Sequence, residues 1–302
     1  MFSRKSPHRL LLITAFFAAL VIIMTASIYF PIAYFSGDKP FDGYRALRDV
    51  QHQVSLGPRT PGSPGHDQIR NWIQSELIEA GWSVQVQSLE YAGKTVHNVI
   101  AKRGQNTPWV IVGAHYDTRF FADRDADPSK QTQPVPGGND GASGVAVLLE
   151  LARTLPDDLD REIWLVFFDA EDNGGIPGWQ WIMGSTAFVD QLQGKPDKVV
   201  ILDMIGDADL NIYYERNSDP DMSADIWRQA SELGYREQFI PLEKFSMLDD
   251  HTPFLEAGIP AVDIIDFDYP FWHTTDDTSD KVSAASLKAV GDTIRAWLIG
   301  VQ

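Results

Sequence analysis

Three carboxylates are crowded into four positions at the end of an apolar run. Residues 163–168, IWLVFF, are continuously apolar, a pattern typical of a strand buried on both faces. Asp169, Glu171 and Asp172 follow directly. Carboxylates this close repel one another and resist burial unless a cation or hydrogen-bond donors compensate them. Because few Lys or Arg residues lie nearby, the segment indicates a site that could hold a divalent cation.

Further ligand-type residues follow other apolar segments. His115 comes after WVIVGA, Asp203 after KVVIL, and Asp140 and His273 lie on separate predicted loops. Together with Asp172 these nitrogen and oxygen donors could surround one or two divalent ions, and zinc accepts such a donor set. The chain has no Cys, which excludes a thiolate metal site, a Cys nucleophile and a disulfide framework.

Strand and helix patterns alternate along the chain. Apolar residues at helical spacing, or short apolar segments, predict helices over 65–81, 139–155, 221–234, 249–258 and 282–300. Strand patterns cover 82–91, 97–103, 109–117, 163–172, 198–206 and 259–266. This alternation predicts an α/β fold, an open, mostly parallel twisted sheet with helices on both faces. Ligands of such sheets bind beyond the carboxyl ends of the strands, where the acids and histidines lie.

The N-terminal segment differs from the rest. Residues 10–30 carry no charge and the apolar character continues to residue 35, which is long enough to span a bilayer. Arg4, Lys5 and Arg9 precede this run, and positive charges favour the cytoplasmic side. We therefore predict a single-pass protein of the cell membrane, with a cytoplasmic N-terminus (1–9), a transmembrane signal-anchor (10–35) and an extracytoplasmic catalytic domain (36–302). The alternative is a cleaved signal peptide and a secreted domain.

The charge balance argues against nucleic acid as a partner. The net charge is −17, and without Arg4, Lys5 and Arg9 the chain carries 22 basic against 42 acidic residues. Such a surface repels a phosphate backbone. The length after the N-terminal segment is typical of one large α/β domain, and the oligomeric state stays unknown from the sequence.

Five motifs in register resemble one known superfamily. They are GAHYDT, NDGASGVAVLLELAR, FFDAED, LDMIG, and DDHTPFLEAGIPA followed by FWHTTDD. Over about residues 45 to 300 the chain resembles the zinc-dependent aminopeptidase and glutaminyl cyclase superfamily, and within it the bacterial glutaminyl-peptide cyclotransferase-like members. The resemblance implies a zinc exopeptidase-like fold and a zinc enzyme that acts on the N-termini of peptides or proteins.

The glutaminyl cyclase branch implies one zinc ion, held by Asp140, Asp172 and His273. Glu171 would move a proton from the attacking α-amine of an N-terminal Gln to the departing ammonia, and 5-oxoproline would form. Asp203 and Asp249 would belong to a hydrogen-bond network behind Glu171.

The aminopeptidase branch is the alternative. It implies two zinc ions, the second held by His115, Asp140 and Asp203, with Glu171 as the general base for an attacking water. A non-catalytic binding domain or structural ectodomain is disfavoured, because such a domain has no physical reason to keep costly carboxylates together.

Several residues favour the cyclase. Asp249 stands where the peptidases more often have Ser or another small residue, and Trp272 directly precedes His273. The resemblance implies that Trp272 lines the substrate pocket. Trp179 and Trp181 lie near Glu171 in the sequence, where cyclases also place Trp, so we expect these indoles to line the pocket as well. One departure is Asp172, which animal cyclases replace with the longer Glu. We expect Asp169, which matches no ligand of the family, to bond to loop backbone.

Overall fold

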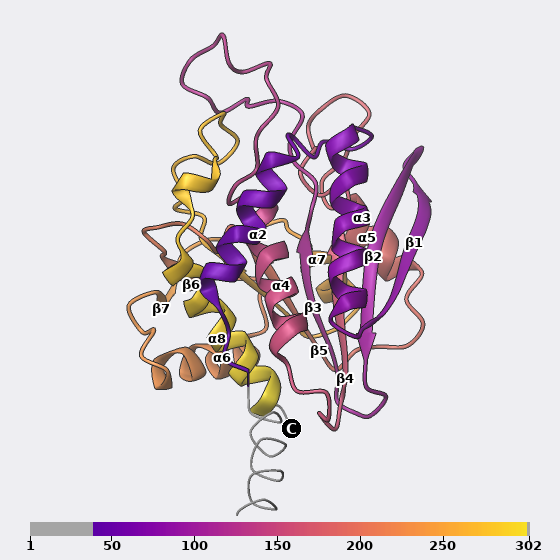
Figure 1. Cartoon of the computed structure of the whole chain (residues 1–302), viewed down its shortest axis with the longest axis vertical. Coiled ribbons are helices and arrows are strands. Elements are labelled where there is room, and N and C mark those ends of the chain that lie inside the picture. The colour runs from indigo at the N-terminus through magenta and orange to yellow at the C-terminus, as the bar shows by residue number, and fades with distance from the viewer. Residues whose placement is uncertain (1–38, 301–302) are drawn as a thin grey trace, which may run out of the picture. The chain divides into compact units, whose positions relative to one another are not determined.

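The computed structural model describes residues 39–300 (Figure 1). No helix in this described part is long and apolar enough to cross a membrane. The cytoplasmic N-terminus (1–9) and transmembrane segment (10–35) that the sequence predicts lie outside the described residues, so both stay predictions.

Helices and strands alternate as the sequence predicts. The helices are α2 (Gly43–Ser55), α3 (Pro64–Glu79), α4 (Ala142–Thr154), α5 (Met183–Asp190), α6 (Pro220–Glu232), α7 (Thr252–Glu256), the 3₁₀ turn η1 (Ser279–Lys281) and α8 (Ala284–Gly300). The strands are β1 (Ser83–Tyr91), β2 (Lys94–Arg103), β3 (Trp109–His115), β4 (Glu162–Phe168), β5 (Lys198–Asp203), β6 (Ile212–Tyr214), β7 (Phe239–Glu243) and β8 (Ala261–Ile265).

The main sheet has six strands in the order β1-β2-β4-β3-β5-β8. Strands β4, β3, β5 and β8 run parallel to one another, whereas β1 and β2 form an antiparallel pair and β2 is antiparallel to β4. The mostly parallel sheet is therefore confirmed, with an antiparallel edge. The sequence patterns do not predict α2 or the small parallel sheet of β6 and β7.

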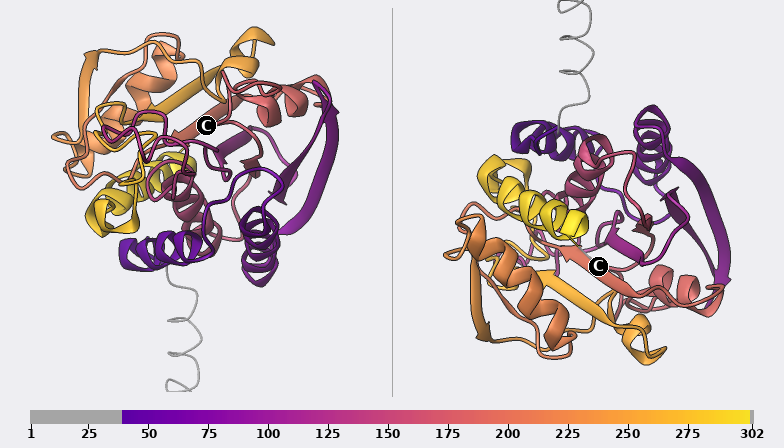
Figure 2. Two further views of the ribbon diagram at one scale, coloured as in Figure 1. Left: turned by 90° about the horizontal axis from the view of Figure 1, so that it is seen from above. Right: turned by 90° about the horizontal axis from the view of Figure 1, so that it is seen from below.

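Helices cover both faces of the sheet (Figure 2). Alternate residues of the central strands enter different apolar clusters: Val110 and Val112 pack on the side of α4 and α8, and Ile111 packs on the other side with Phe188 of α5 and Phe254 of α7. The continuous apolar runs arise because both faces of these strands are buried.

Helix α4 lies unusually close to the sheet at Gly144. A Cβ atom at this position would lie 2.3 Å from the carbonyl oxygen of Leu202 in β5 and 2.8 Å from Cβ of Ala114 in β3. The missing side chain lets the helix rest directly on both strands. This contact places Asp140, two residues before α4, beside the carboxyl ends of β3 and β5.

Gly144→Ala should destabilise the fold by about 1–3 kcal/mol, because the new methyl group overlaps a backbone carbonyl that cannot move alone. At a solvent-exposed position inside a helix the same change would stabilise the fold by up to about 1 kcal/mol. Gly300→Ala is the matched control, since an added Cβ there meets no atom of the described residues within 4 Å. The midpoint of urea unfolding measures both variants. A midpoint for Gly144→Ala at or above that of the unchanged protein would contradict the close packing.

Candidate active site

The carboxyl ends of three parallel strands bring together the side chains that the sequence singles out. His115 is the last residue of β3, Asp203 is the last residue of β5, and Asp172 lies in the turn that follows β4. Asp140 precedes α4, and His273 lies in the segment between β8 and η1. All five side chains are at most 12% exposed, so the sheet topology assembles one buried cluster.

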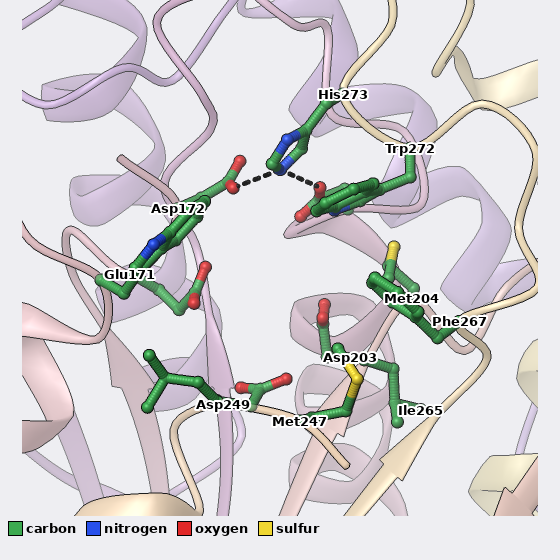
Figure 3. A pocket seen from close by; sticks show the side chains of 13 residues that line it. Glu171, Asp172, Asp203, Met204, Met247, Asp249, Ile265, Phe267, Trp272 and His273 are labelled. Carbon is green, nitrogen blue, oxygen red and sulfur yellow. Dashed lines mark hydrogen bonds and ion pairs between the residues drawn. The ribbon is translucent and has the colours of Figure 1, made fainter. Parts of the chain in front are cut away.

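Asp140, Asp172 and His273 form the first of two candidate metal-binding groups. One nitrogen or oxygen atom of each lies within 4.8 Å of those of the other two. Nε2 of His273 is 2.7 Å from Oδ1 of Asp172 and 3.8 Å from Oδ2 of Asp140 (Figure 3). This group contains the three residues that the resemblance implies for a single zinc ion.

His115, Asp140 and Asp203 form the second group. Nε2 of His115 lies 3.1 Å from Oδ1 of Asp203 and 3.2 Å from Oδ1 of Asp140. Asp140 therefore faces one histidine with each oxygen, Oδ1 toward His115 and Oδ2 toward His273. This arrangement is the one expected of a carboxylate shared between two sites.

The cluster fits a divalent cation. Oδ2 of Asp140 and Oδ2 of Asp172 are buried without a hydrogen-bond partner among the described residues. Burying a carboxylate oxygen with no partner is costly, and a cation between these oxygens and Nε2 of His273 would remove that cost. Two carboxylates and one imidazole are a donor set that zinc accepts.

Burial and mutual repulsion alter the proton affinities in the cluster. Burial raises the pKa of Asp172 to about 6 and that of Asp203 to about 7, and the negative charge of Asp140 adds to both shifts. Burial alone would lower the pKa of His273, but the charges of Asp172 and Asp123 outweigh it and raise the pKa to about 9. Without a cation the site therefore retains protons near neutral pH.

Left-handed backbone conformations occur beside three of the functional side chains. Ala170 precedes Glu171 with φ of 54°, Met204 follows Asp203 with φ of 46°, and His273 itself has φ of 56°. Non-glycine residues in this region cost about 1–3 kcal/mol each and persist only where neighbouring structure holds them. Sharp turns at the strand ends thus aim the side chains, and the surrounding hydrogen bonds maintain the strain.

Two further aspartates hold the backbone beside functional side chains, Asp117 in the turn after β4 and Asp277 in the segment before α4. The carboxylate of Asp117 accepts hydrogen bonds from the backbone N–H groups of Glu171 at 3.0 Å and Asp172 at 3.3 Å. The carboxylate of Asp277 accepts from the N–H groups of Asn139 at 2.8 Å and Asp140 at 3.3 Å. The sequence placed Asp117 at a strand end and Asp277 in FWHTTDD, but only the loop geometry reveals what they bind.

Asp169 turns away from the cluster, as expected for an acid that matches no ligand. It accepts a hydrogen bond from the backbone N–H of His97 at 2.8 Å, and its other oxygen lies 2.7 Å from Nε2 of His66. The backbone partner lies in strand β2 rather than in a loop. His66, which shows no ligand-type pattern in the sequence, is its buried side-chain partner.

A pocket opens beside the cluster, with Glu171, Asp203 and Asp249 among its lining side chains (Figure 3). Across from Glu171 its wall is apolar and includes Met247, Ile265 and Phe267. The complete lining is Asp140, Glu171, Asp172, Trp181, Asp203, Met204, Met247, Leu248, Asp249, Ile265, Phe267, Trp272 and His273.

The three tryptophans that we expect to line the pocket differ in their positions. Trp181 and Trp272 line the pocket, but Trp179 does not. Trp179 packs instead with a small apolar cluster that includes Val96 and Met183, and its ring lies 5.2 Å from that of Phe120. Trp179 therefore lies outside the lining of this pocket, because a shift of two positions along the turn directs its indole toward Val96 of β2.

Glu171 is poised to hold a proton. Burial raises its pKa well above the ordinary value, and the nearby carboxylates of Asp172 and Asp249 add to the shift. Burial likewise raises the pKa of Asp249. A buried acid with a raised pKa beside a pocket can accept a proton and return it to a bound molecule.

Comparisons with known proteins agree with this geometry. Residues 98–298 match the model of peptidase family M28. The chain is 25% identical to a glutaminyl-peptide cyclotransferase of Boiga irregularis, over 80% of this chain and 77% of that protein. A crystal structure of a glutaminyl cyclase of Bacteroides thetaiotaomicron is similar, with a TM-score of 0.83 and 30% identity over 88% of this chain and 100% of that one. A crystal structure of a Zn-dependent exopeptidase of Parabacteroides distasonis is also similar, with a TM-score of 0.82 and 28% identity over 87% of this chain and 100% of that one.

The affinity for zinc should rise with pH, because protons on Asp172 and His273 compete with the metal. With the pKa of His273 raised to about 9 and that of Asp172 to about 6, binding between about pH 6 and 9 must displace the imidazolium proton. The affinity should then rise by about tenfold per pH unit, and more steeply below about pH 6. Titration against a chelator of known pH dependence measures this slope. An affinity that stays constant between about pH 6 and 8 would contradict the proton competition.

Proposed function

The chain belongs to peptidase family M28 and is an enzyme, and we propose that it is a zinc-dependent glutaminyl-peptide cyclotransferase-like enzyme. Its substrates are peptides or proteins with an N-terminal Gln, which it converts to 5-oxoproline with release of ammonia. One observation carries this proposal: Glu171 faces a pocket that also contains the two buried carboxyl groups of Asp203 and Asp249 and has an apolar opposite wall.

Cyclisation requires a group that keeps a proton rather than one that activates water. The α-amine nitrogen of the substrate forms a bond to the side-chain amide carbon, and the bond from that carbon to the amide nitrogen breaks. Glu171 accepts the proton that the amine loses and returns it to the departing nitrogen, which leaves as ammonia. The raised pKa of Glu171 suits this exchange, because the proton stays on the carboxyl group between the two steps.

The carboxyl groups of Asp203 and Asp249 support this role. Both line the pocket with Glu171, and their negative charge disfavours loss of a proton from it. Trp272 and Phe267 supply apolar surface beside these acids. In the proposed reaction this surface would limit the access of water and so favour attack by the amine over hydrolysis.

We propose one zinc ion, held by Asp140, Asp172 and His273. When bound it supplies a Lewis acid that polarises the amide carbonyl. His115 then remains paired with Asp203 through Nε2 at 3.1 Å, and Nδ1 of His115 lies 3.5 Å from Asp117. In this assignment the imidazole of His115 balances the negative charges of the surrounding acids. In the two-zinc alternative, a second metal ion would balance these charges.

The alternative function is a two-zinc aminopeptidase that hydrolyses N-terminal residues from peptides. The observation that favours it is the complete second group, in which His115 and Asp203 approach Asp140 from the side opposite to the first group. The similarity to a Zn-dependent exopeptidase is consistent with this reading.

The cell membrane is the proposed location, with the N-terminus inside and the catalytic domain outside. The support is the uncharged run of residues 10–30 and the basic residues Arg4, Lys5 and Arg9 before it. Peptide or protein N-termini outside the cytoplasm would then be the substrates.

A peptide with N-terminal Gln, followed by mass spectrometry, tests the reaction. The proposal predicts loss of ammonia from an otherwise intact peptide. Release of free Gln would contradict it and support the aminopeptidase. A matched peptide with N-terminal Leu sharpens the comparison, because only an aminopeptidase can act on it. Acetylation of the Gln peptide should abolish cyclisation, since the blocked amine cannot attack.

Glu171→Gln should reduce turnover by a factor of about a hundred or more, because the amide cannot exchange the proton. The variant should keep its fold and its zinc, since Glu171 belongs to neither metal-binding group. Initial rates with the Gln peptide and the zinc content per chain measure the two effects. A variant that turns over at the normal rate would show that another group moves the proton.

A further inference from the structure

The loop between β3 and α4 is joined to the segment that carries His273. The backbone N–H of Arg124 donates to the carbonyl oxygen of His273 at 3.2 Å. Both the backbone N–H and the hydroxyl group of Thr275 donate to Asp125, at 3.1 and 2.7 Å. These bonds hold His273 in its left-handed backbone conformation. The loop therefore supports a residue of the metal-binding group from outside the pocket.

Aromatic stacking fixes the plane of the His273 ring. The indole of Trp272 is stacked with the imidazole at a centroid distance of 3.8 Å, and that of Trp181 at 6.1 Å with an interplanar angle of 10°. Arginines of the same loop cover these indoles, Arg119 at 4.9 Å from the Trp181 ring and Arg124 at 5.1 Å from the Trp272 ring. Cation–π contacts of this kind favour a fixed ring position.

Stacking fixes the plane of the His273 ring but not its orientation within that plane, because a flipped imidazole would present a carbon atom instead of Nε2 to the cluster. Asp123 lies at the position that distinguishes these two orientations. Its Oδ1 lies 3.5 Å from Nδ1 of His273, while Nε2 of the same ring is 2.7 Å from Asp172. The 3.5 Å separation is long for a hydrogen bond, so the contact is chiefly electrostatic in this structure.

Arg119 fixes the carboxylate of Asp123. Nε and Nη2 of Arg119 donate to the two oxygens of Asp123, at 3.0 and 2.6 Å. Nη1 of the same guanidinium donates to the carbonyl oxygens of Asp172 at 2.8 Å and Gly174 at 3.2 Å. One buried arginine thus ties the turn that carries Asp172 to the aspartate that faces His273.

We propose that Asp123, fixed by Arg119, is the positioning residue for His273. Its carboxylate keeps the hydrogen of the imidazole on Nδ1, so that the lone pair of Nε2 is directed at the metal. Partners of this kind orient histidine ligands and raise their basicity. The inference rests on the proposed role of His273 as a zinc ligand, but it is independent of which reaction the enzyme catalyses.

The ionisation of Asp123 agrees with this role. Burial opposes the charge, but the interaction with the nearby imidazole of His273 and the hydrogen bonds from Arg119 outweigh burial and hold the pKa of Asp123 below its ordinary value. The group is therefore an anionic acceptor throughout the neutral pH range.

Asp123→Asn tests the positioning role in the full chain. The amide has the same size, but its NH₂ group can donate to Nδ1 and so favour the hydrogen on Nε2. We expect the affinity for zinc to fall by about 10- to 100-fold, measured by competition with a chelator. NMR of the imidazole nitrogens in the zinc-loaded protein should show the hydrogen of His273 on Nδ1 before the substitution and a changed pattern after it.

Three further variants separate the possible outcomes. Asp127→Asn is the matched control, because Asp127 lies in the same loop and accepts hydrogen bonds from Ser129; its zinc affinity should be unchanged. Asp123→Glu keeps the charge and should restore part of the affinity. His273→Ala should lose zinc, and its failure to do so would overturn the metal site itself. If His273→Ala loses zinc while Asp123→Asn binds it as the unchanged protein does, the positioning role is wrong.

Discussion

The structure depends on how the negative charge of Asp140 is compensated. This buried carboxylate faces His115 with one oxygen and His273 with the other, and Asp172 and Asp203 lie beyond the two histidines. Such a group of acids is unfavourable at the end of an apolar sheet unless positive charge lies among them. The parallel sheet provides the site, because separate strands end at one edge and each contributes a side chain.

The fold around the cluster serves to keep these side chains at fixed positions. Left-handed residues turn the chain sharply after β4 and β5 and at His273. The carboxylate of Asp117 binds backbone N–H groups of the turn after β4, and that of Asp277 binds those of Asn139 and Asp140 before α4. The close approach of α4 to the sheet fixes Asp140 in the same way. The proposed chemistry adds Glu171 and Asp249, which line the same pocket as residues of the cluster.

The sequence predicted much of this arrangement and missed parts of it for physical reasons. Continuous apolar runs identify the central strands, and His115, Asp172 and Asp203 follow these runs. The resemblance to the zinc enzyme superfamily adds Asp140 and His273 and implies the two metal-binding groups. The direction of a side chain within an irregular loop is not encoded in periodicity, so the sequence could not separate Trp179 from Trp181 or reveal what Asp123 faces. Strand β6 has only three residues, and three of the five residues of β7 are exposed, so neither segment forms a continuous apolar run.

We propose that a single zinc ion, held by Asp140, Asp172 and His273, compensates the cluster. Metal analysis of the purified protein, combined with anomalous diffraction at the zinc edge, measures the number of zinc ions and their positions. We expect full activity with one zinc per chain and a single anomalous peak between these three residues, with His115 left paired to Asp203. Two fully occupied zinc positions in the active enzyme, the second between His115 and Asp203, would contradict it.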